Sequence, residues 1–299
     1  MSVTINIVSR ITVISIVVLL SISGVSMVTA NSITNSAAAS TSQTKESLHV
    51  VSASRANLIG GSGTTLNWAG YVVATSFSNP QPVISGISGS WVLQKVKPTS
   101  NLDQYTYSSQ WVGIGGYFSG ELIQVGTESD TYSGFFGIGA TTYYAWYEML
   151  PYNGQPGNSS EVKIKMAVHP GNIMVAEIFG NNPTWTITIA DTNTSGFFQK
   201  VFTYNTDMKS GDFIDERPTV NGGLPTLANF GTAYFGPAYA GSGNYNTVTE
   251  TDGNVYFLGS NGIQNVALTM DNSSGNVLAQ PSSLNNDLQS FTVTWKRGS

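Results

Sequence analysis

The chain contains no cysteine among its 299 residues, which excludes disulfide bonds, thiolate nucleophiles and cysteine-ligated zinc. Histidine is almost as scarce, and the two present, His49 and His169, argue against a histidine metal site. We therefore expect neither a metal nor a cofactor. Charged residues make up only 10% of the chain, the net charge is −5, and there is no basic patch. This charge pattern argues against a nucleic-acid partner.

The scarcity of charge is compatible with function in acid. A carboxylate whose folded pKa is depressed stabilises the fold only above its unfolded pKa, and that contribution is lost as the pH falls through the folded value. A fold that depends on few such groups loses little stability in acid. A neutral, Ser- and Thr-rich secreted surface explains the same composition, and composition does not separate the two interpretations.

Long hydrophobic runs are absent after residue 30, so no later segment is predicted to span a bilayer. Residues 1–30 have the pattern of a secretory signal peptide: Arg10, an apolar run over 11–20, and the small-residue end Val28-Thr29-Ala30. A retained membrane anchor is the alternative, but Ser and Gly dilute residues 21–26. We therefore expect a secreted, extracellular protein without membrane association once the signal is removed.

Residues 31–62 are rich in Ser, Ala and Thr and contain too few apolar side chains to form a core. They are predicted to be a linker or a pro-segment, as in a zymogen, and simple N-terminal disorder remains an alternative. Residues 63–299 show no second domain and no repeat, so we expect one domain. We also expect the protein to be a monomer.

This domain is predicted to be all-β, because its short strand-like segments are separated by Gly, Asn and Pro. The first is Asn67–Ala74, and the others are Val83–Leu93, Tyr105–Gly115, Glu121–Thr127, Ser133–Gly137, Thr141–Leu150, Glu161–Val168, Ile173–Phe179, Thr184–Ala190, Phe197–Tyr204, Ala233–Phe235, Val255–Leu258, Asn265–Met270 and Ser290–Lys296. The pattern favours an antiparallel β-sandwich of two large packed sheets, similar to concanavalin.

Residues 109–150 concentrate aromatic, amide and carboxylate side chains on alternating faces. The two-residue period of a strand places Gln124 on the same face as Leu122 and Gly126, and it places Glu148 beside Trp146. Gly126 would leave room for a ligand backbone to approach. An amide and a carboxylate among large apolar groups predict a substrate site.

A second carboxylate of interest is Glu216, at the end of the strand-like segment 211–216 and two residues before Pro218. Pro218 ends strand pairing, which leaves the carboxylate at a strand terminus where a ligand could reach it. A solvated loop carboxylate or a local pair with Arg217 is the alternative. A Ser-His-Asp triad is not expected, because His169 lies in a His-Pro-Gly turn.

Four motifs occur in an order that resembles the glutamic peptidase (eqolisin) family: Trp111-Val112-Gly113-Ile114, Leu122-Ile123-Gln124-Val125-Gly126, Tyr144-Ala145-Trp146-Tyr147-Glu148 and Phe213-Ile214-Asp215-Glu216-Arg217-Pro218. Asn67-Trp68-Ala69-Gly70 resembles the first strand of that family's mature domain. The resemblance covers the chain from about residue 66 onwards. It implies a secreted, acid-active endopeptidase on a β-sandwich, made with a signal peptide and a pro-segment.

By the same resemblance, Gln124 and Glu216 are the catalytic residues, and Trp68, Trp146, Glu148 and Glu128 bind substrate. Glu128 replaces the family's usual aspartate. Gly115 stands where an acidic residue is usual after the Trp-Val-Gly-Ile motif, and Phe213 stands where tryptophan is usual.

The chemistry of this pair suits peptide hydrolysis. An ionised Glu216 can take a proton from water and return it to the leaving amine, while the Gln124 amide can hold that water and stabilise an oxyanion. Two alternatives remain open from the residues themselves. One is a β-sandwich glycoside hydrolase with Glu148 and Glu216 as paired carboxylates, and the other is a carbohydrate-binding module without turnover.

Overall fold

The computed structural model describes residues 62–99, 101, 103–134, 139–151 and 159–299. One sheet contains β1 (Ser62–Thr65), β2 (Trp68–Ala74), β5 (Ser109–Gly115), β6 (Leu122–Ser133), β7 (Gly139–Leu150), β8 (Ser159–Lys163), β12 (Gly211–Glu216) and β17 (Gln264–Asp271), with β4 (Gln104–Tyr107) and β13 (Thr226–Leu227) at its border. Its order is β8-β7-β6-β5-β12-β2-β17-β1, and only the β1–β17 pair of this series is parallel.

The second sheet contains β3 (Ile84–Val92), β9 (Ile173–Asn181), β10 (Thr184–Asp191), β11 (Phe197–Thr203), β14 (Thr232–Phe235), β15 (Thr247–Glu250), β16 (Val255–Phe257), β18 (Val277–Pro281) and β19 (Phe291–Trp295). Strands β11, β10, β9 and β3 pair in that order, and β3 then pairs with β14 and β15 on its other side. Strand β18 pairs with both β17 and β19, which joins the sheets at one edge. The short helix α2 (Pro237–Ala240) follows β14.

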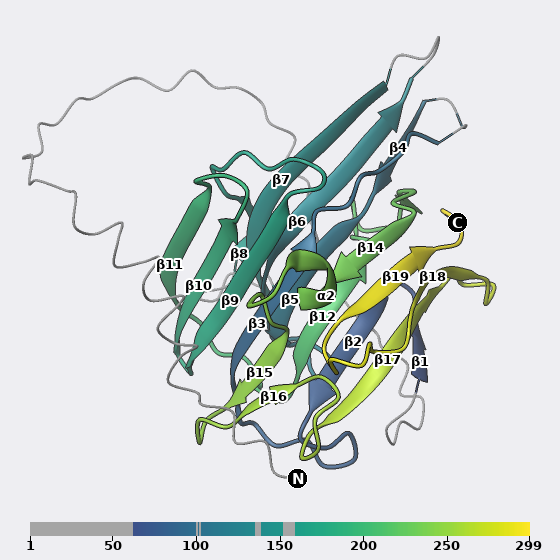
Figure 1. Ribbon diagram of the computed structural model, residues 1–299. Coiled ribbons are helices and arrows are strands. Elements are labelled where there is room, and N and C mark those ends of the chain that lie inside the picture. The colour runs from purple at the N-terminus through teal and green to yellow at the C-terminus, as the bar shows by residue number, and fades with distance from the viewer. Residues whose placement is uncertain (1–61, 100, 102, 135–138, 152–158) are drawn as a thin grey trace, which may run out of the picture. The chain divides into compact units, whose positions relative to one another are not determined.

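The two sheets pack face to face, as Figure 1 shows for β9, β3 and β19 in one layer and β6, β5 and β2 in the other. The main hydrophobic core lies between them and draws on both, with Trp91 and Trp185 from the second sheet and Val125 and Phe213 from the first. The Trp91 indole N–H donates to Thr127 Oγ1 across the layers, at 2.9 Å. The predicted all-β antiparallel sandwich is confirmed.

A second, smaller apolar cluster covers the opposite face of the first sheet. It includes Trp68, Trp111, Trp146 and Ile214. Strands of this sheet are buried on both faces, so they lack the simple alternation of polar and apolar residues that one solvated face produces. This doubly buried sheet carries every residue predicted for the site.

Several boundaries differ from the sequence-based prediction. Strand β6 runs to Ser133, six residues past its predicted end, because its pairing with β7 continues along a long hairpin. The predicted strand 161–168 ends at Lys163, beyond which Lys165 is exposed and Ile164 is buried. Strands β1, β13, β15 and β18 were not predicted, because each has at most five residues and its sequence shows no sustained two-residue period.

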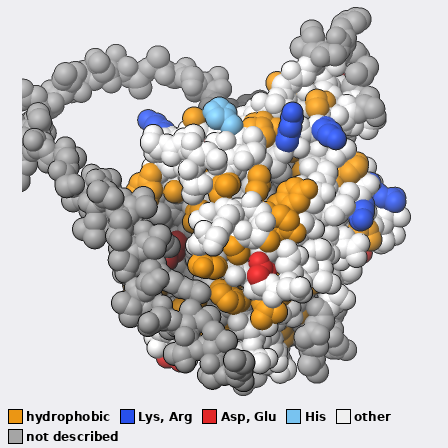
Figure 2. Space-filling model, in the orientation of Figure 1, with side chains coloured by type: hydrophobic (Ala, Val, Ile, Leu, Met, Phe, Trp, Pro, Cys, Tyr) orange, Lys and Arg blue, Asp and Glu red, His pale blue; other side chains and the backbone are white. Residues whose placement is uncertain are grey.

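The predicted signal peptide and nearly all of the predicted pro-segment lie outside the described residues, and Ser62, the last residue of that segment, begins β1. Within the described part of the chain, no helix has the length and apolar character needed to cross a membrane. Figure 2 shows one face of the molecule, on which charged side chains are few.

Candidate active site

Cross-strand pairing arranges the predicted site residues in three rows on one face of the first sheet, which we call the site face. Directly paired residues of neighbouring antiparallel strands project to the same side. The first row is Trp68, Glu216, Ser109, Glu128 and Tyr144; the second is Gly70, Ile214, Trp111, Gly126 and Trp146; the third is Val72, Asp212, Gly113, Gln124 and Glu148. All six predicted residues therefore share this face.

The Glu216 carboxyl group accepts hydrogen bonds from three side chains. Asn67 Nδ2 and Trp68 Nε1 donate to Oε1 at 3.0 and 3.2 Å, and Trp111 Nε1 donates to Oε2 at 2.7 Å. Both oxygens of the carboxyl group therefore act as hydrogen-bond acceptors. The neighbouring Arg217 donates through Nη2 to the backbone carbonyl of Leu224 at 3.1 Å.

Gln124 is bonded to the other carboxylate of the site face. Its Nε2 donates to Glu148 Oε2 at 2.9 Å, directly across the β6–β7 pair. Gln124 Oε1 has no hydrogen-bond partner among the described residues. Because one amide hydrogen is used by Glu148, the second remains for another acceptor.

Gln124 and Glu216 lie on the same face but not in the same row. Gln124 pairs with Gly113 and Glu216 pairs with Ser109, two same-face steps apart along β5. Trp111 lies between Ser109 and Gly113 on this face of β5, and its indole N–H donates to Glu216. The structure thus brings Gln124 into direct contact with Glu148, while Trp111 occupies the floor between the two halves of the site.

The remaining predicted residues, Glu128 and Trp146, lie in the first and second rows of the site face. Trp146 Nε1 donates to Ser109 Oγ at 3.0 Å, which fixes its indole over β5. Glu128 is 1% exposed and pairs with Ser109 and Tyr144. Burial, followed by the nearby charges of Glu128 and Glu161, raises the pKa of Tyr144.

Gly126 has a different role from the one predicted. A Cβ at this position would lie 2.4 Å from the Gln110 carbonyl oxygen and 2.5 Å from Trp111 Cβ. The glycine therefore permits β5 and Trp111 to approach β6, rather than leaving open room for a ligand.

Two buried aspartates on β12 complete the electrostatic setting. Asp212 faces the site, and Asp215 faces the main core, where it accepts from Ser108 Oγ at 2.9 Å. Burial is the largest cause that raises the pKa of each well above its ordinary value. A neighbouring charge adds to this effect, from Asp207 at Asp212 and from Glu128 and Glu216 at Asp215.

The sequence-based prediction of the site did not include Asn67, Trp111 or Ser109, whose side chains bond to Glu216 or Trp146. Asn67 and Trp111 lie within the motifs that carry the family resemblance. Their hydrogen bonds join Glu216 to residues 149 and 105 positions away, a proximity that strand periodicity cannot show. No group of three or more potential metal-binding His, Asp or Glu side chains occurs in the described part of the chain.

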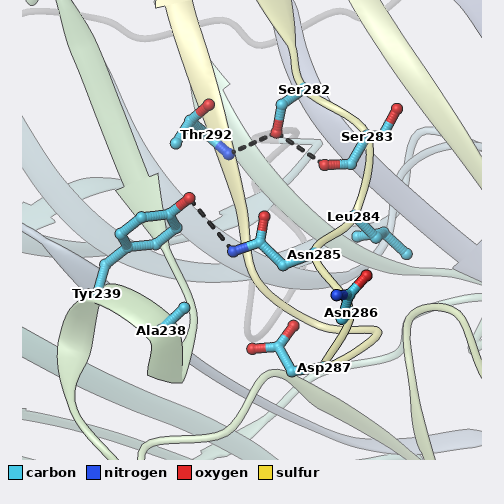
Figure 3. Close-up of a pocket in the computed structure, with 9 residues that line it drawn as sticks. All are labelled: Ala238, Tyr239, Ser282, Ser283, Leu284, Asn285, Asn286, Asp287 and Thr292. Carbon is cyan, nitrogen blue, oxygen red and sulfur yellow. Dashed lines mark hydrogen bonds between the residues drawn. The ribbon is translucent and has the colours of Figure 1, made fainter.

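A surface pocket elsewhere does not contain these residues. Figure 3 shows it between α2 and the loop before β19, lined by Tyr239, Asn285 and Asp287 among others. The Asp287 carboxylate is already bonded to the Ser290 and Gln289 backbone N–H groups at 2.9 and 3.1 Å. His169 is exposed in a turn, where its carbonyl accepts from Asn172 N. Neither feature offers an alternative to the site face.

This chain was compared with known protein families and solved structures. The sequence model of the peptidase A4 family matches residues 66–279. Scytalido-glutamic peptidase, solved with a transition state analog inhibitor, has the same fold: the TM-score is 0.57 and the identity 16%, over 77% of this chain and 98% of that one. Tailspike protein 2 of Escherichia coli O157:H7 bacteriophage CAB120 matches with a TM-score of only 0.25 and 12% identity, over 56% of this chain and 21% of that one.

No curated protein matches the chain. The family match spans most of the described domain and decides between peptide hydrolysis and the two carbohydrate alternatives. The chain belongs to the peptidase A4 family and is a glutamic peptidase, a hydrolase that acts on the peptide bonds of polypeptides.

Proposed function

We propose that this peptidase is a secreted endopeptidase that works in acid through Glu216 and Gln124. The observation that carries the proposal is the set of three N–H donors on Glu216, on the same sheet face as the Gln124–Glu148 pair. The three donors hold the carboxyl group in one orientation, from which it can exchange a proton with a bound water.

In the proposed reaction, Glu216 removes a proton from water as the water oxygen attacks the scissile carbonyl carbon. The C=O π electrons move to the oxygen, which becomes an oxyanion in the tetrahedral intermediate. Glu216 then delivers the proton to the amide nitrogen as the C–N bond breaks, and the products are a carboxylic acid and an amine. One residue thus serves as general base and then as general acid.

Gln124 supplies hydrogen-bond donation to the oxyanion. Glu148 holds one amide hydrogen and thereby sets the plane of the carboxamide, which directs the second hydrogen at the reacting carbonyl. Unlike a carboxyl partner, the amide does not titrate, so the pair works with a single ionised group.

Trp68, Trp146 and Glu128 are proposed to contact the substrate beside this pair. The indole N–H groups of Trp68 and Trp146 are occupied by Glu216 and Ser109, so their ring faces are the surfaces left for a peptide. We further propose that the enzyme is a monomer that binds neither nucleic acid nor, after signal removal, a membrane.

Gln124, Glu148 and Glu216 are each 0% exposed, so a peptide reaches them only after neighbouring side chains move. We propose that residues 1–30 are a signal peptide and that 31–62 are a pro-segment removed on activation. Mass spectrometry of the secreted, active enzyme should find an N-terminus near residue 62. A fully active enzyme that begins at Asn31 would contradict this proposal.

The proposed base is tested with Glu216→Gln, which keeps the shape of the side chain but cannot accept the water proton. We expect hydrolysis of an unfolded protein in acid to fall by at least about 10²–10⁴-fold, the usual contribution of general acid–base catalysis. Glu250→Gln, on β15 of the other sheet, is the matched control and should retain activity. Near-normal turnover by a folded Glu216→Gln variant would exclude Glu216 as the base.

A further inference from the structure

The end of the site face away from Glu216 holds two carboxyl groups that the proposed reaction does not use. Asp212 lies on β12, four residues before Glu216 and on the same face, opposite Gly113 of β5. It is 0% exposed. Its Oδ2 lies 3.5 Å from Ser210 Oγ, and its Oδ1 has no hydrogen-bond partner among the described residues.

Asp207 approaches the same end of β5 from the segment that precedes β12. Its Oδ1 accepts from Lys209 N at 3.0 Å, and it would lie 3.0 Å from a Cβ at Gly115. Its Oδ2 is buried and also lacks a hydrogen-bond partner among the described residues. Gly115 has a φ of +84° and donates its N–H to Ser210 O, so the segment carrying Asp207 is fixed to the end of β5.

A carboxyl group from Asp207 thus reaches the space beside Gly115 from a different segment of the chain.

The surroundings of the two groups disfavour two negative charges. Burial raises the pKa of both aspartates, and the charge of Asp207 raises that of Asp212 further. The charge of Glu121 also raises the pKa of Asp207, whereas hydrogen bonds from Lys209 and Ser119 and the charge of Lys209 lower it without cancelling the effect of burial. Tyr117, which faces Asp212, adds no positive charge. Two nearby carboxyl groups in such a setting titrate as one unit.

We propose that Asp207 and Asp212 share one proton and form a carboxyl pair that holds this end of the site face together only in acid. The Asp212 O–H donates to the Asp207 carboxylate, which joins the segment before β12 to the floor of the site. Loss of the shared proton leaves two like charges beside Gly113 and Gly115 and loosens β12, whose other end carries Glu216. The two aspartates are positioning residues, and they act on catalysis through this strand.

The test measures the fall in melting temperature between pH 4 and pH 7, a quantity that does not depend on the proposed function. Asp212→Asn and Asp207→Asn should each reduce this fall, because each removes one of the two like charges. The double variant, Asp207→Asn with Asp212→Asn, should show a fall in melting temperature only slightly smaller than that of Asp212→Asn alone, since the pair titrates as a unit. Asp252→Asn, in an exposed turn, should leave the fall unchanged.

Equal falls in wild type, Asp212→Asn and Asp252→Asn would overturn the proposal. Fully additive single variants would overturn the shared proton and leave two independent carboxyls. If Asp212→Asn does not fold, Asp207→Asn provides the test. A fall in its melting temperature equal to that of the wild type would contradict the pairing.

The catalytic consequence rests on the proposed function. The pH at which hydrolysis declines on the neutral side should move up by about one unit in Asp212→Asn, in line with the coupling expected of interacting sites. If Glu216→Gln is inactive but its melting temperature falls between pH 4 and pH 7 as much as that of the wild type, the carboxyl pair is tested independently of the catalytic role of Glu216.

Discussion

At the scale of single residues, the proposed mechanism divides two tasks between an acid and an amide. Glu216 accepts hydrogen bonds from three N–H donors, while the Gln124 amide, which does not titrate, is hydrogen-bonded to Glu148. In this proposal, Glu216 alone exchanges the proton at the reacting carbonyl, and Glu148 orients the Gln124 amide.

The role of Gln124 is tested by Gln124→Glu, which keeps the shape and adds a titrating group beside Glu148. Protonated, the new side chain donates one hydrogen bond to Glu148 or to the oxyanion but not to both, so turnover should fall by about 10²–10³-fold. What activity remains should be confined to lower pH than in the wild type, because ionisation removes the last donor. The measurement is the pH–rate profile on a peptide substrate.

A thermal melt at acid pH serves as its control. A melting temperature close to that of the wild type would show that the loss is catalytic, whereas an unchanged pH–rate profile with full turnover would remove Gln124 from the mechanism.

At the scale of elements, the site depends on how closely β5 and β6 approach. Gly126 lies opposite Trp111, and the Trp111 side chain in turn donates to Glu216. The position of the carboxylate is therefore linked to the absence of a side chain two strands away. Sheets tolerate glycine poorly in their interiors, so its presence here indicates a close contact.

Gly126→Ala tests this link. The added methyl group would lie 2.5 Å from Trp111 Cβ, so Trp111 or β5 must shift. Overpacking of this kind costs about 1–3 kcal/mol, and we expect a lower melting temperature together with reduced turnover. Gly120→Ala is the matched control, because a Cβ there meets no atom within 4 Å. Equal stability of the two variants would contradict the close-contact explanation.

At the scale of the whole molecule, stability should be greatest in acid. Asp207, Asp212 and Asp215 have raised folded pKa values, chiefly because they are buried. Below the unfolded pKa, near 3.9, both states are protonated and these groups cost nothing. As the pH rises towards the folded values, the unfolded chain releases protons first, so the free energy of unfolding decreases.

Asp215→Asn tests whether a buried aspartate on the core side of β12 makes the free energy of unfolding decrease as the pH rises. Asparagine keeps an oxygen that can accept from Ser108, but it does not titrate. The decrease in the free energy of unfolding between pH 4 and pH 7, measured by denaturant titration, should be smaller than in the wild type. A larger decrease, or stability that rises towards neutral pH, would show that the sign is wrong.

The amino-acid sequence determined the class of the fold and the identity of the main candidate residues. Its short strand segments and turn residues predict the antiparallel sandwich. Four motifs in order identify Gln124 and Glu216 as the candidate catalytic residues. The absence of cysteine and the scarcity of histidine exclude whole classes of mechanism. These properties depend on local pattern and composition, which the sequence carries directly.

Only the tertiary structure decided what surrounds those residues. A two-residue period shows which face a side chain takes, but the register between strands selects its neighbours, and strands that pair here are far apart in the chain. Asn67 and Trp111 reach Glu216 for this reason, and Asp207 reaches Gly115 in the same way. The donors on the proposed base and the carboxyl pair are consequences of strand pairing, and no local pattern in the sequence encodes them.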